Sequence, residues 1–355
     1  MRCCAVAVGV LAIASCGDEL VAPLARELPE APPGFVESVG VAHDDLEPLE
    51  RLGPPYPIIL VHGFSGFTDA GPLEYFFEVK DRLEELGNDV TAPALPPYNS
   101  SDERAQVLAN VVDEVLARTR KAKVHIIAHS QGGLDTRVLV GGMGYGPFVA
   151  SVTTISTPHR GTAVADLATE APEGVLNPAG SFLAWVVGAA EGEPPSEAAW
   201  ADDATSDTWT PELGAAIAGL TSAASADRVA RNPMPPDVPF FTVAGVSNLR
   251  SLDNVDCAAS LWPRADRVDD TDPLLLPTGT FLSFTGGGDV LDPTPNDGLV
   301  TVNSARAPDS TFLGCVPADH LDELGLIADF GAGLISGWNH RQLYENIVAN
   351  ARTVE

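Results

Sequence analysis

Ser130 lies in a segment whose residue types suit a nucleophile. Ala128–Gly133 reads Ala-His-Ser-Gln-Gly-Gly, follows an apolar run and opens a stretch with helical spacing. A serine on such a strand-to-helix turn is held on strained backbone, which makes its hydroxyl protrude. The residues two before and two after the serine must be small, because their Cβ atoms would crowd the turn. Ala128 and Gly132 meet this condition, so the pattern predicts a nucleophile, the alternative being a Gly-rich turn with no catalytic role.

A short loop after an earlier apolar run could complete such a site. His62-Gly63-Phe64 directly follows Ile58–Val61, which has the composition of a strand buried on both faces. A backbone N–H from such a loop, with the N–H of the residue after the nucleophile, binds the negative oxygen of a tetrahedral intermediate. Phe64 and Gln131 are therefore the candidate oxyanion donors. His62 is interpreted as a structural residue that positions the loop.

A serine nucleophile needs a base, and the base needs a carboxylate that orients it. With this kind of turn the chain order is serine, acid, histidine. Of the seven histidines only His320 and His340 lie late enough to follow an acid. The candidate acids are Asp297, Asp289 and Asp292. Pattern alone favours Asp297 only slightly, because its Asn-Asp-Gly context also forms tight turns.

Alternating strand and helix patterns surround these residues. The continuous apolar run at residues 58–61 predicts a buried strand, and further strands are predicted at 90–92, 124–128, 149–155 and 240–243. Helical spacing predicts helices at 73–86, from about 100 to 115, and at 132–140, with Gly87 ending the first and a Ser100–Glu103 capping box starting the second. The alternation predicts an α/β fold, a mostly parallel central sheet flanked by helices. From about 162 to 239 the rhythm breaks, which predicts a helical insertion over the sheet.

Composition excludes several classes of protein. The chain has 355 residues, of which 45% are hydrophobic, enough for a large core and too many for a disordered chain. Its formal net charge of −29 argues against nucleic acid, whose phosphates would be repelled. The same charge argues against electrostatic docking on anionic membranes, so any lipid contact must be apolar. The acidity is otherwise interpreted as favouring solubility.

The N-terminus has the features of an export signal. Residues 1–15 hold a minimal positive start and a short apolar run, Ala5–Ala14, that cannot span a bilayer. Residues 13–17, Ile-Ala-Ser-Cys-Gly, resemble the lipobox of bacterial lipoproteins, whose cysteine thiol carries the lipid. The sequence therefore predicts an exported protein anchored at Cys16, an ordinary signal peptide being the alternative. Residues 16–55, rich in Pro and Glu, are predicted to be a tether and lead-in to a domain over 56–355.

The five cysteines divide by position. Cys3 and Cys4 would leave with the signal peptide and Cys16 would carry lipid, which leaves Cys257 and Cys315. An even pair in an oxidising compartment predicts a disulfide, two free buried thiols being the alternative. In the chain-entropy model a loop of this length contributes about 4 kcal/mol to stability.

Five segments in this order resemble motifs of the bacterial true lipases, secreted triacylglycerol lipases that often require a dedicated foldase. They are residues 56–64, 129–134, the adjacent pair 151–155 and 157–161, 296–300 and 320–323. One nucleophile turn is common, but this ordered set is specific. The resemblance implies the α/β-hydrolase fold and a triad of Ser130, Asp297 and His320, with His340 as the other candidate base.

The resemblance also implies a structural calcium ion near the catalytic histidine. Asp322, two residues after His320, matches one ligand, and Asp272 is the nearest match to a second, with Asp269 and Asp270 as rivals. Oxygen ligands suit Ca²⁺. A helix-start carboxylate is the alternative interpretation of Asp322. The family's cysteine after the acid motif is absent here, so Cys315 could serve a shifted disulfide.

The implied function is hydrolysis of lipid esters, that is, a triacylglycerol lipase acting at a lipid interface, with a foldase as a possible partner. A lipase also needs an apolar lid, and the insertion offers a short helix for it that Ser181 could cap. Its apolar face would hold Phe182, Trp185, Val186 and Ala189. Packing of that helix on the core is the alternative. A short-chain carboxylesterase or a polyester depolymerase would share the triad, and a binding lipoprotein on a hydrolase scaffold is a further alternative from a different class.

Overall fold

The computed structural model describes residues 51–64, 66, 75–170, 213–249, 252, 257, 261, 268–325 and 338–355. All of them belong to one compact unit, Leu49–Glu355. The predicted signal peptide, the lipidation site Cys16, most of the tether and the predicted lid helix at 181–189 lie outside the described residues.

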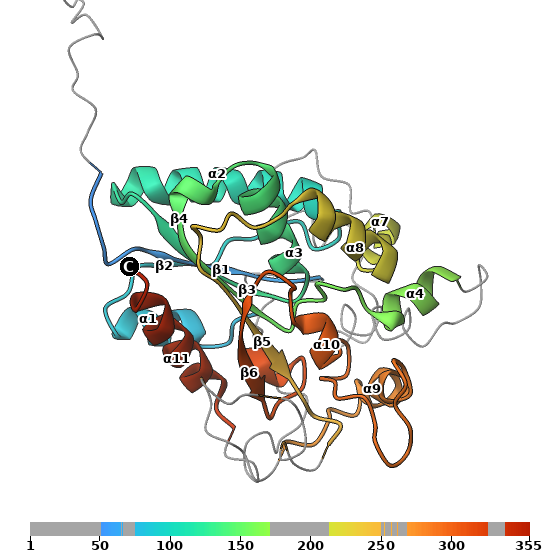
Figure 1. The fold of residues 1–355 in the computed structure, drawn as a ribbon. Helices are drawn as coiled ribbons and strands as arrows, with labels where there is room; N and C mark the ends of the chain where they lie inside the picture. Colours follow the sequence, from blue (N-terminus) through green and yellow to red (C-terminus); the bar gives the residue numbers. More distant parts are fainter. Residues whose placement is uncertain are drawn as a thin grey trace, which may run out of the picture. The chain divides into compact units, whose positions relative to one another are not determined.

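Six parallel strands form the central sheet, in the order β2-β1-β3-β4-β5-β6 (Figure 1). The strands are β1 Ile58–Val61, β2 Val90–Thr91, β3 Val124–His129, β4 Val149–Ile155, β5 Phe240–Gly245 and β6 Thr311–Val316. The predicted α/β class and parallel sheet are confirmed. The sixth strand is the element that the apolar runs did not predict.

Helices connect and cover the strands. The longer ones are α1 Val79–Glu85, α2 Ser101–Thr119, α3 Gln131–Arg137, α4 Ala163–Glu170, α7 Leu213–Gly219, α8 Ser222–Arg231, α9 Leu276–Ser283 and α11 His340–Arg352. Shorter turns are α10 Val302–Ala305, the π turn η2 Val138–Gly142, and the 3₁₀ turns η3 Gly146–Phe148 and η4 Asp322–Leu324. None of the helices that the structure describes is long and apolar enough to cross a bilayer.

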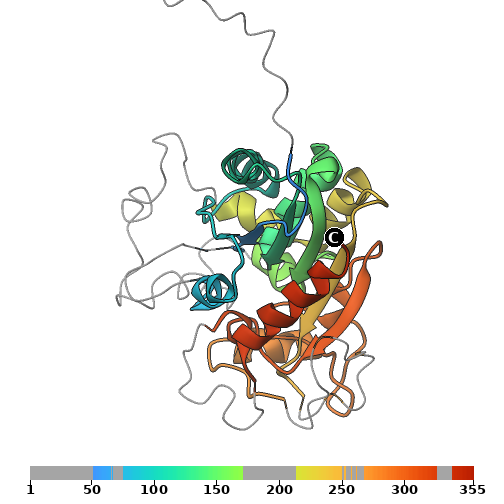
Figure 2. The same cartoon turned by 90° about the vertical axis from the view of Figure 1, so that its left-hand side faces the viewer.

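The two faces of the sheet are covered by different helices. Side chains alternate along a strand, so Ile59 and Val61 pack with the apolar residues of α2, while Ile58 and Leu60 pack with those of α1 and α11. Figures 1 and 2 show α2 and α11 on opposite sides of the sheet. The continuous apolar composition of β1 follows from this burial on both faces.

Two helix boundaries and one helix cap differ from the predictions. The first helix begins at Val79, not at Leu73, because Glu78 takes a left-handed conformation with φ of 54°. The helix after the nucleophile turn ends at Arg137 and continues as a π turn. At α2 the Ser100 hydroxyl accepts the Glu103 N–H at 3.3 Å, as predicted, but the Ser100 N–H bonds to Asn99 instead of Glu103.

Cys257 and Cys315 form a disulfide, with their Cα atoms 5.2 Å apart. Cys315 lies in β6 and is buried in a cluster with apolar residues of β5 and α10. The bridge therefore ties the segment after β5 to the strand that leads directly to His320.

Candidate active site

Three side chains from distant parts of the chain meet beyond the carboxyl ends of the strands. His320 Nε2 lies 3.0 Å from Ser130 Oγ, and His320 Nδ1 lies 2.8 Å from Asp297 Oδ2. Asp297 and His320 are buried, at 1% and 5% exposure. The structure thus brings together the serine, the acid and the histidine that the lipase resemblance implied.

The backbone holds Ser130 in the strained geometry that the motif predicts. Ser130 has φ of 54° and ψ of −131° between β3 and α3, a conformation that few residues other than glycine adopt. A Cβ atom on Gly132 would lie 2.6 Å from the carbonyl oxygens of both Val61 and His62. Only glycine therefore lets the turn approach β1 this closely.

Hydrogen bonds to both carboxylate oxygens fix the orientation of Asp297. Its Oδ1 accepts the N–H groups of Leu299 and Val300, at 2.9 and 2.6 Å, which leaves Oδ2 for His320. The backbone N–H of His320 also donates to the backbone carbonyl oxygen of Asp297 at 2.9 Å. The rival acids Asp289 and Asp292 are exposed, and the Asp289 carboxylate accepts local backbone N–H groups.

The two predicted oxyanion donors lie on either side of Ser130 in the fold. A Cβ atom on Gly63 would meet the Ser130 Cβ at 2.6 Å, so the His62–Phe64 loop passes directly over the nucleophile. Within the described part of the chain, neither the Phe64 N–H nor the Gln131 N–H is hydrogen-bonded to another residue. Both amides are available to bind a developing negative charge.

The solved structures similar to this chain are lipases and esterases. Staphylococcus hyicus lipase superposes with a TM-score of 0.56 at 19% identity, covering 86% of this chain and 97% of that one. The mature Bacillus licheniformis lipase BlEst2 gives a TM-score of 0.55 at 21% identity, over 81% and 94%. The chain has the α/β-hydrolase fold. At these identities the likeness establishes the fold alone.

Sequence relatives of this α/β-hydrolase confirm the resemblance to bacterial lipases. A triacylglycerol lipase of Pseudarthrobacter phenanthrenivorans is 43% identical over 117 residues, 31% of this chain and 35% of that protein. A triacylglycerol lipase of Vibrio cholerae is 39% identical over 112 residues, 32% and 35% respectively. The chain thus spans about a third of the length of the curated relatives it matches. The family model described as palmitoyl protein thioesterase matches residues 57–189.

Two other histidines of the described residues, His340 and His62, bond to backbone groups. His340, the alternative base, begins α11 and its Nε2 lies 2.9 Å from the Phe77 carbonyl oxygen. His62 positions the loop, as predicted: its Nε2 accepts the Leu95 N–H at 2.8 Å, and its Nδ1 lies 2.9 Å from the Gly63 carbonyl oxygen. Burial beside Arg104 lowers the pKa of His62 to about 3, so this imidazole is neutral.

A buried ion pair behind the loop escaped the sequence analysis. Arg104 and Asp135 are fully buried and joined at 2.7 Å, and Arg104 also donates to the His62 carbonyl oxygen at 2.7 Å. Arg104 belongs to α2 and Asp135 to α3, so the pair connects both helices to the loop over Ser130. Sequence spacing gave no signal for it, because the two residues are 31 positions apart.

A chain of hydrogen bonds beneath the triad was also missed. Ser156 Oγ donates to Glu323 Oε1 at 2.6 Å, and Glu323 Oε2 lies 3.1 Å from His129 Nε2. His129 Nδ1 lies 2.8 Å from the Tyr75 hydroxyl, which accepts the Gly63 N–H at 2.9 Å. Burial, together with the charge of Asp297, raises the pKa of Glu323. Burial lowers the pKa of His129, so its ring is neutral.

His129, His320 and Glu323 each offer one possible metal-ligand atom within 4.8 Å of the others. Each of these residues already hydrogen-bonds to another residue of the site: His129 and Glu323 to one another, and His320 to Ser130 and Asp297. A metal ion here would replace the hydrogen bonds of the triad histidine. The group fits a hydrogen-bonded network better than a metal centre.

The carboxylates predicted to bind calcium lie close to the triad histidine. The N–H groups of Asp272 and Asp322 both donate to the Asp319 carboxylate, at 2.7 and 2.9 Å, and all three residues are buried. Burial, together with the charge of Asp272, raises the pKa of Asp319 to about 7. Of the rival ligands, Asp270 is exposed and Asp269 is buried.

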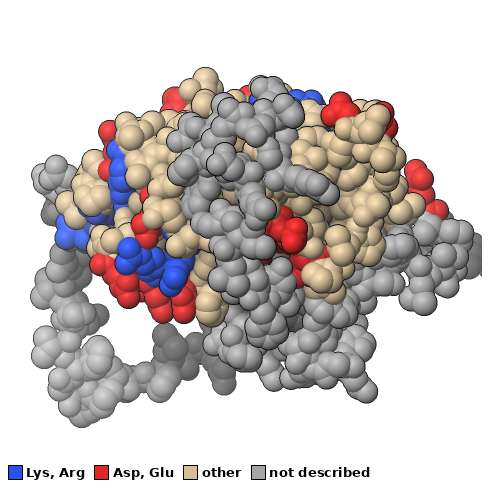
Figure 3. Space-filling model, turned by 90° about the horizontal axis from the view of Figure 1, so that it is seen from below, with Lys and Arg blue, Asp and Glu red and all other residues tan. Residues whose placement is uncertain are grey.

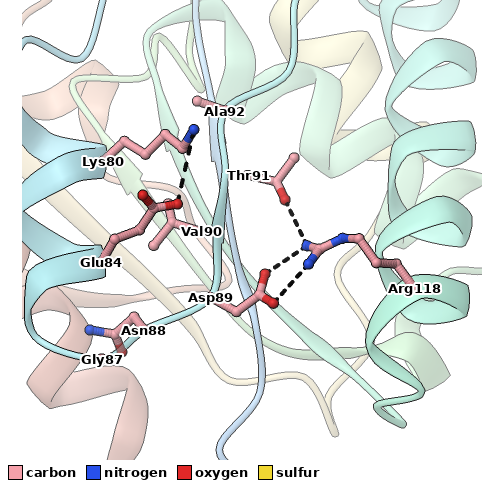
Figure 4. Close-up of a pocket in the computed structure, with 9 residues that line it drawn as sticks. All are labelled: Lys80, Glu84, Gly87, Asn88, Asp89, Val90, Thr91, Ala92 and Arg118. Atoms are coloured by element: carbon pink, nitrogen blue, oxygen red, sulfur yellow. Dashed lines mark hydrogen bonds and ion pairs between the residues drawn. The ribbon is translucent and has the colours of Figure 1, made fainter.

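A surface hollow at the edge of the sheet is separate from this site. Arg118 pairs there with Asp89 at 2.6 Å, and Lys80 with Glu84 at 3.9 Å (Figure 4). The hollow adjoins the start of β2, whose Val90 pairs with the first residue of β1. Ser130 follows the last residue of β3, and the strands are parallel. The hollow therefore lies toward the amino ends of the strands, away from the triad.

Proposed function

We propose that this protein is a serine ester hydrolase that cleaves lipid esters. The observation that carries the proposal is the pair of contacts from His320, 3.0 Å to Ser130 Oγ and 2.8 Å to Asp297 Oδ2. The strained turn at Ser130 and the two unbonded amides beside it support the same chemistry.

In the proposed mechanism His320 Nε2 accepts the Ser130 proton as Oγ attacks the ester carbonyl carbon. Asp297 holds the proton on Nδ1 and stabilises the imidazolium. The N–H groups of Phe64 and Gln131 bind the oxyanion of the tetrahedral intermediate. His320 then protonates the departing alcohol, and water attacks the acyl-enzyme by the same steps to release the acid.

The substrate that we propose is a long-chain lipid ester such as a triacylglycerol. The names of the sequence relatives support it, and the thioesterase family model also names a long acyl group. Apolar side chains are exposed on and after α9: Leu276, Phe281, Phe284, Val290 and Leu291. Figure 3 shows one face on which charged side chains gather mainly at one side, while much of the other described surface is uncharged. The exposed apolar side chains on and after α9 suit contact with lipid.

A substrate panel tests this proposal. We expect hydrolysis of a triolein emulsion, with kcat/KM for p-nitrophenyl esters rising from the acetate to the decanoate. A short-chain carboxylesterase would instead prefer the acetate and leave triolein intact, and a polyester depolymerase would release monomer from a polyester film. No hydrolysis of any ester, together with binding of lipid, would identify a non-catalytic lipoprotein.

We further propose that Asp322 and Asp272 hold a structural calcium ion. Their burial, their common attachment to Asp319 and their hard oxygen donors support this. When bound, calcium would neutralise these carboxylates and hold the segment that carries His320. A ligand at about 100 times its dissociation constant adds about 2.7 kcal/mol, or about 4 °C in a domain of this size.

The calcium prediction is checked by thermal unfolding. Wild type should lose about 4 °C of melting temperature in a chelator and regain it with added calcium. Asp322→Asn should melt at the same temperature with and without calcium. Asp270→Asn, at an exposed rival position, should behave like the wild type. A wild type indifferent to chelation would contradict the site.

Export with a lipid anchor at Cys16 is also a proposal, supported by the signal-like residues 1–15 and the lipobox-like residues 13–17. Palmitate should label the wild type and not Cys16→Ala, and an unlabelled wild type would leave secretion without an anchor. A foldase partner is proposed only from the lipase resemblance, and a comparison of refolded yield with and without one would check it.

A further inference from the structure

Hydrogen bonds hold the successive backbone polar groups of the loop over the nucleophile. The His62 carbonyl oxygen accepts Arg104 Nη2 at 2.7 Å, and the Gly63 N–H donates to the Tyr75 hydroxyl at 2.9 Å. These two groups belong to one peptide plane, so Arg104 and Tyr75 fix its rotation. The Gly63 carbonyl oxygen accepts the Gly66 N–H at 3.2 Å and contacts His62 Nδ1 at 2.9 Å.

The next peptide plane joins the Gly63 carbonyl to the Phe64 N–H, one of the two candidate oxyanion donors. Because a peptide is planar, the direction of the Gly63 carbonyl sets the direction of the Phe64 N–H. The Tyr75 hydroxyl therefore binds the N–H of Gly63, and the next N–H along the chain, that of Phe64, must point at the oxyanion. It also lies 2.9 Å from the place where a Cβ on Gly63 would be, so it packs directly against the loop.

The direction of the Tyr75 hydroxyl follows from its partners. The Gly63 N–H can only donate, so the Tyr75 oxygen must accept it, and the Tyr75 hydroxyl can donate its hydrogen to His129 Nδ1, 2.8 Å away. His129 Nδ1 then carries no proton, and the proton of this neutral ring lies on Nε2, which faces Glu323 Oε2 at 3.1 Å. An acceptor at this position selects that tautomer.

Glu323 is itself fixed from the other side. Ser156 Oγ donates to Glu323 Oε1 at 2.6 Å and accepts the Gly245 N–H at 3.0 Å. The chain therefore runs from the amide of Gly245 in β5 to the amide of Gly63 in the loop. The geometry places four side chains between the two backbone amides, with compatible donors and acceptors at every contact.

We infer that Tyr75 is a positioning residue for the oxyanion hole and that Glu323, acting through His129, orients its hydroxyl. The inference rests on the proposed function, since it assigns the Phe64 amide to the oxyanion. It goes beyond the triad, because the position of an oxyanion donor then depends on a buried hydrogen-bond network. Two residues of this network, Gly63 and Glu323, are 260 positions apart in the sequence.

Tyr75→Phe removes the hydroxyl and keeps the ring. We expect kcat to fall about 10- to 100-fold with KM changed less than about twofold, because a displaced oxyanion donor weakens the transition state and not substrate binding. Affinity for an alkyl boronic acid, which forms a tetrahedral adduct on the serine, should fall by a similar factor. Hydrogen exchange of the peptide that contains Gly63 and Phe64 should become faster.

Tyr344→Phe is the matched control. Tyr344 is a fully buried tyrosine in the same apolar cluster as Tyr75, and its hydroxyl has no hydrogen-bond partner among the described residues. Its substitution should leave kcat, boronic acid affinity and loop exchange unchanged. Tyr75→Phe behaving like Tyr344→Phe in all three would overturn the inference.

Glu323→Gln tests the far end of the network. The glutamine amide has one acceptor oxygen and one donor NH2 group, where the carboxylate has two acceptor oxygens. In either orientation of the amide, one hydroxyl hydrogen of the network is therefore left without an acceptor. We expect a several-fold loss of kcat that largely disappears when Glu323→Gln is added to Tyr75→Phe, since coupled residues are not additive. An equal loss in both backgrounds would show that Glu323 acts independently of Tyr75.

The exchange measurement separates the two proposals. Faster loop exchange in Tyr75→Phe, in a protein that hydrolyses no ester, would contradict the proposed function and retain the network. Unchanged exchange and unchanged kcat in an active wild-type background would contradict the network and retain the function.

Discussion

Replacing Ser130 with alanine is expected to reduce kcat by about 10⁶-fold, a loss of the size found when the nucleophile of a serine triad is removed. Ser130 Oγ is the atom 3.0 Å from His320 Nε2, and its φ of 54° holds it on the turn between β3 and α3. Alanine has no hydroxyl oxygen, so the substitution removes the attacking atom and introduces no new group at the site. Residual turnover would come from the oxyanion amides and substrate binding alone.

The measurement is hydrolysis of a long-chain p-nitrophenyl ester, with labelling by a fluorophosphonate as a second readout. Wild type should be labelled once and Ser130→Ala not at all. Ser304→Ala is the matched control, because Ser304 is a buried serine of α10 outside the triad. Persistent labelling of Ser130→Ala would mean that another residue is the nucleophile.

Local sequence signals predicted the elements that are buried on both faces. β1 and β4 begin and end at the predicted residues, and every residue of both strands is buried. β6 lacked this signal because its first two residues, Thr311 and Phe312, are not buried and Gly314 interrupts it. An edge strand with one partner carries a weaker pattern than a central one.

The candidate site likewise contains residues that a local sequence motif predicted and residues that no local motif predicted. The residues implied by motifs, Ser130, Asp297 and His320, meet in space. Those that support them, such as Arg104 and Tyr75, were not predicted, because each acts through a partner far along the chain. A buried arginine or tyrosine has no local pattern that distinguishes it from its exposed counterparts, so only the fold reveals these contacts.

His320→Ala is expected to reduce kcat by about as much as Ser130→Ala, and the double variant should be no worse than either single one. The serine hydroxyl is a poor nucleophile without a base, so removing the base makes the serine ineffective, and removing the serine leaves the base with no proton to accept. The other ring nitrogen of His320, Nδ1, bonds to Asp297 at 2.8 Å. The substitution therefore removes only the two ring contacts that the proposed triad uses.

His340→Ala distinguishes the two histidines that the chain order left open. His340 bonds to the Phe77 carbonyl oxygen at 2.9 Å and packs at the start of α11, so its loss should lower the melting temperature and leave kcat within about twofold. Steady-state kinetics and thermal unfolding of the three variants measure both quantities. If His340→Ala were inactive while His320→Ala kept more than about one hundredth of wild-type kcat, the base would be His340. An inactive Ser130→Ala with an active His320→Ala would instead mean that Ser130 is activated by a group other than His320, since no described contact offers Ser130 Oγ a second base.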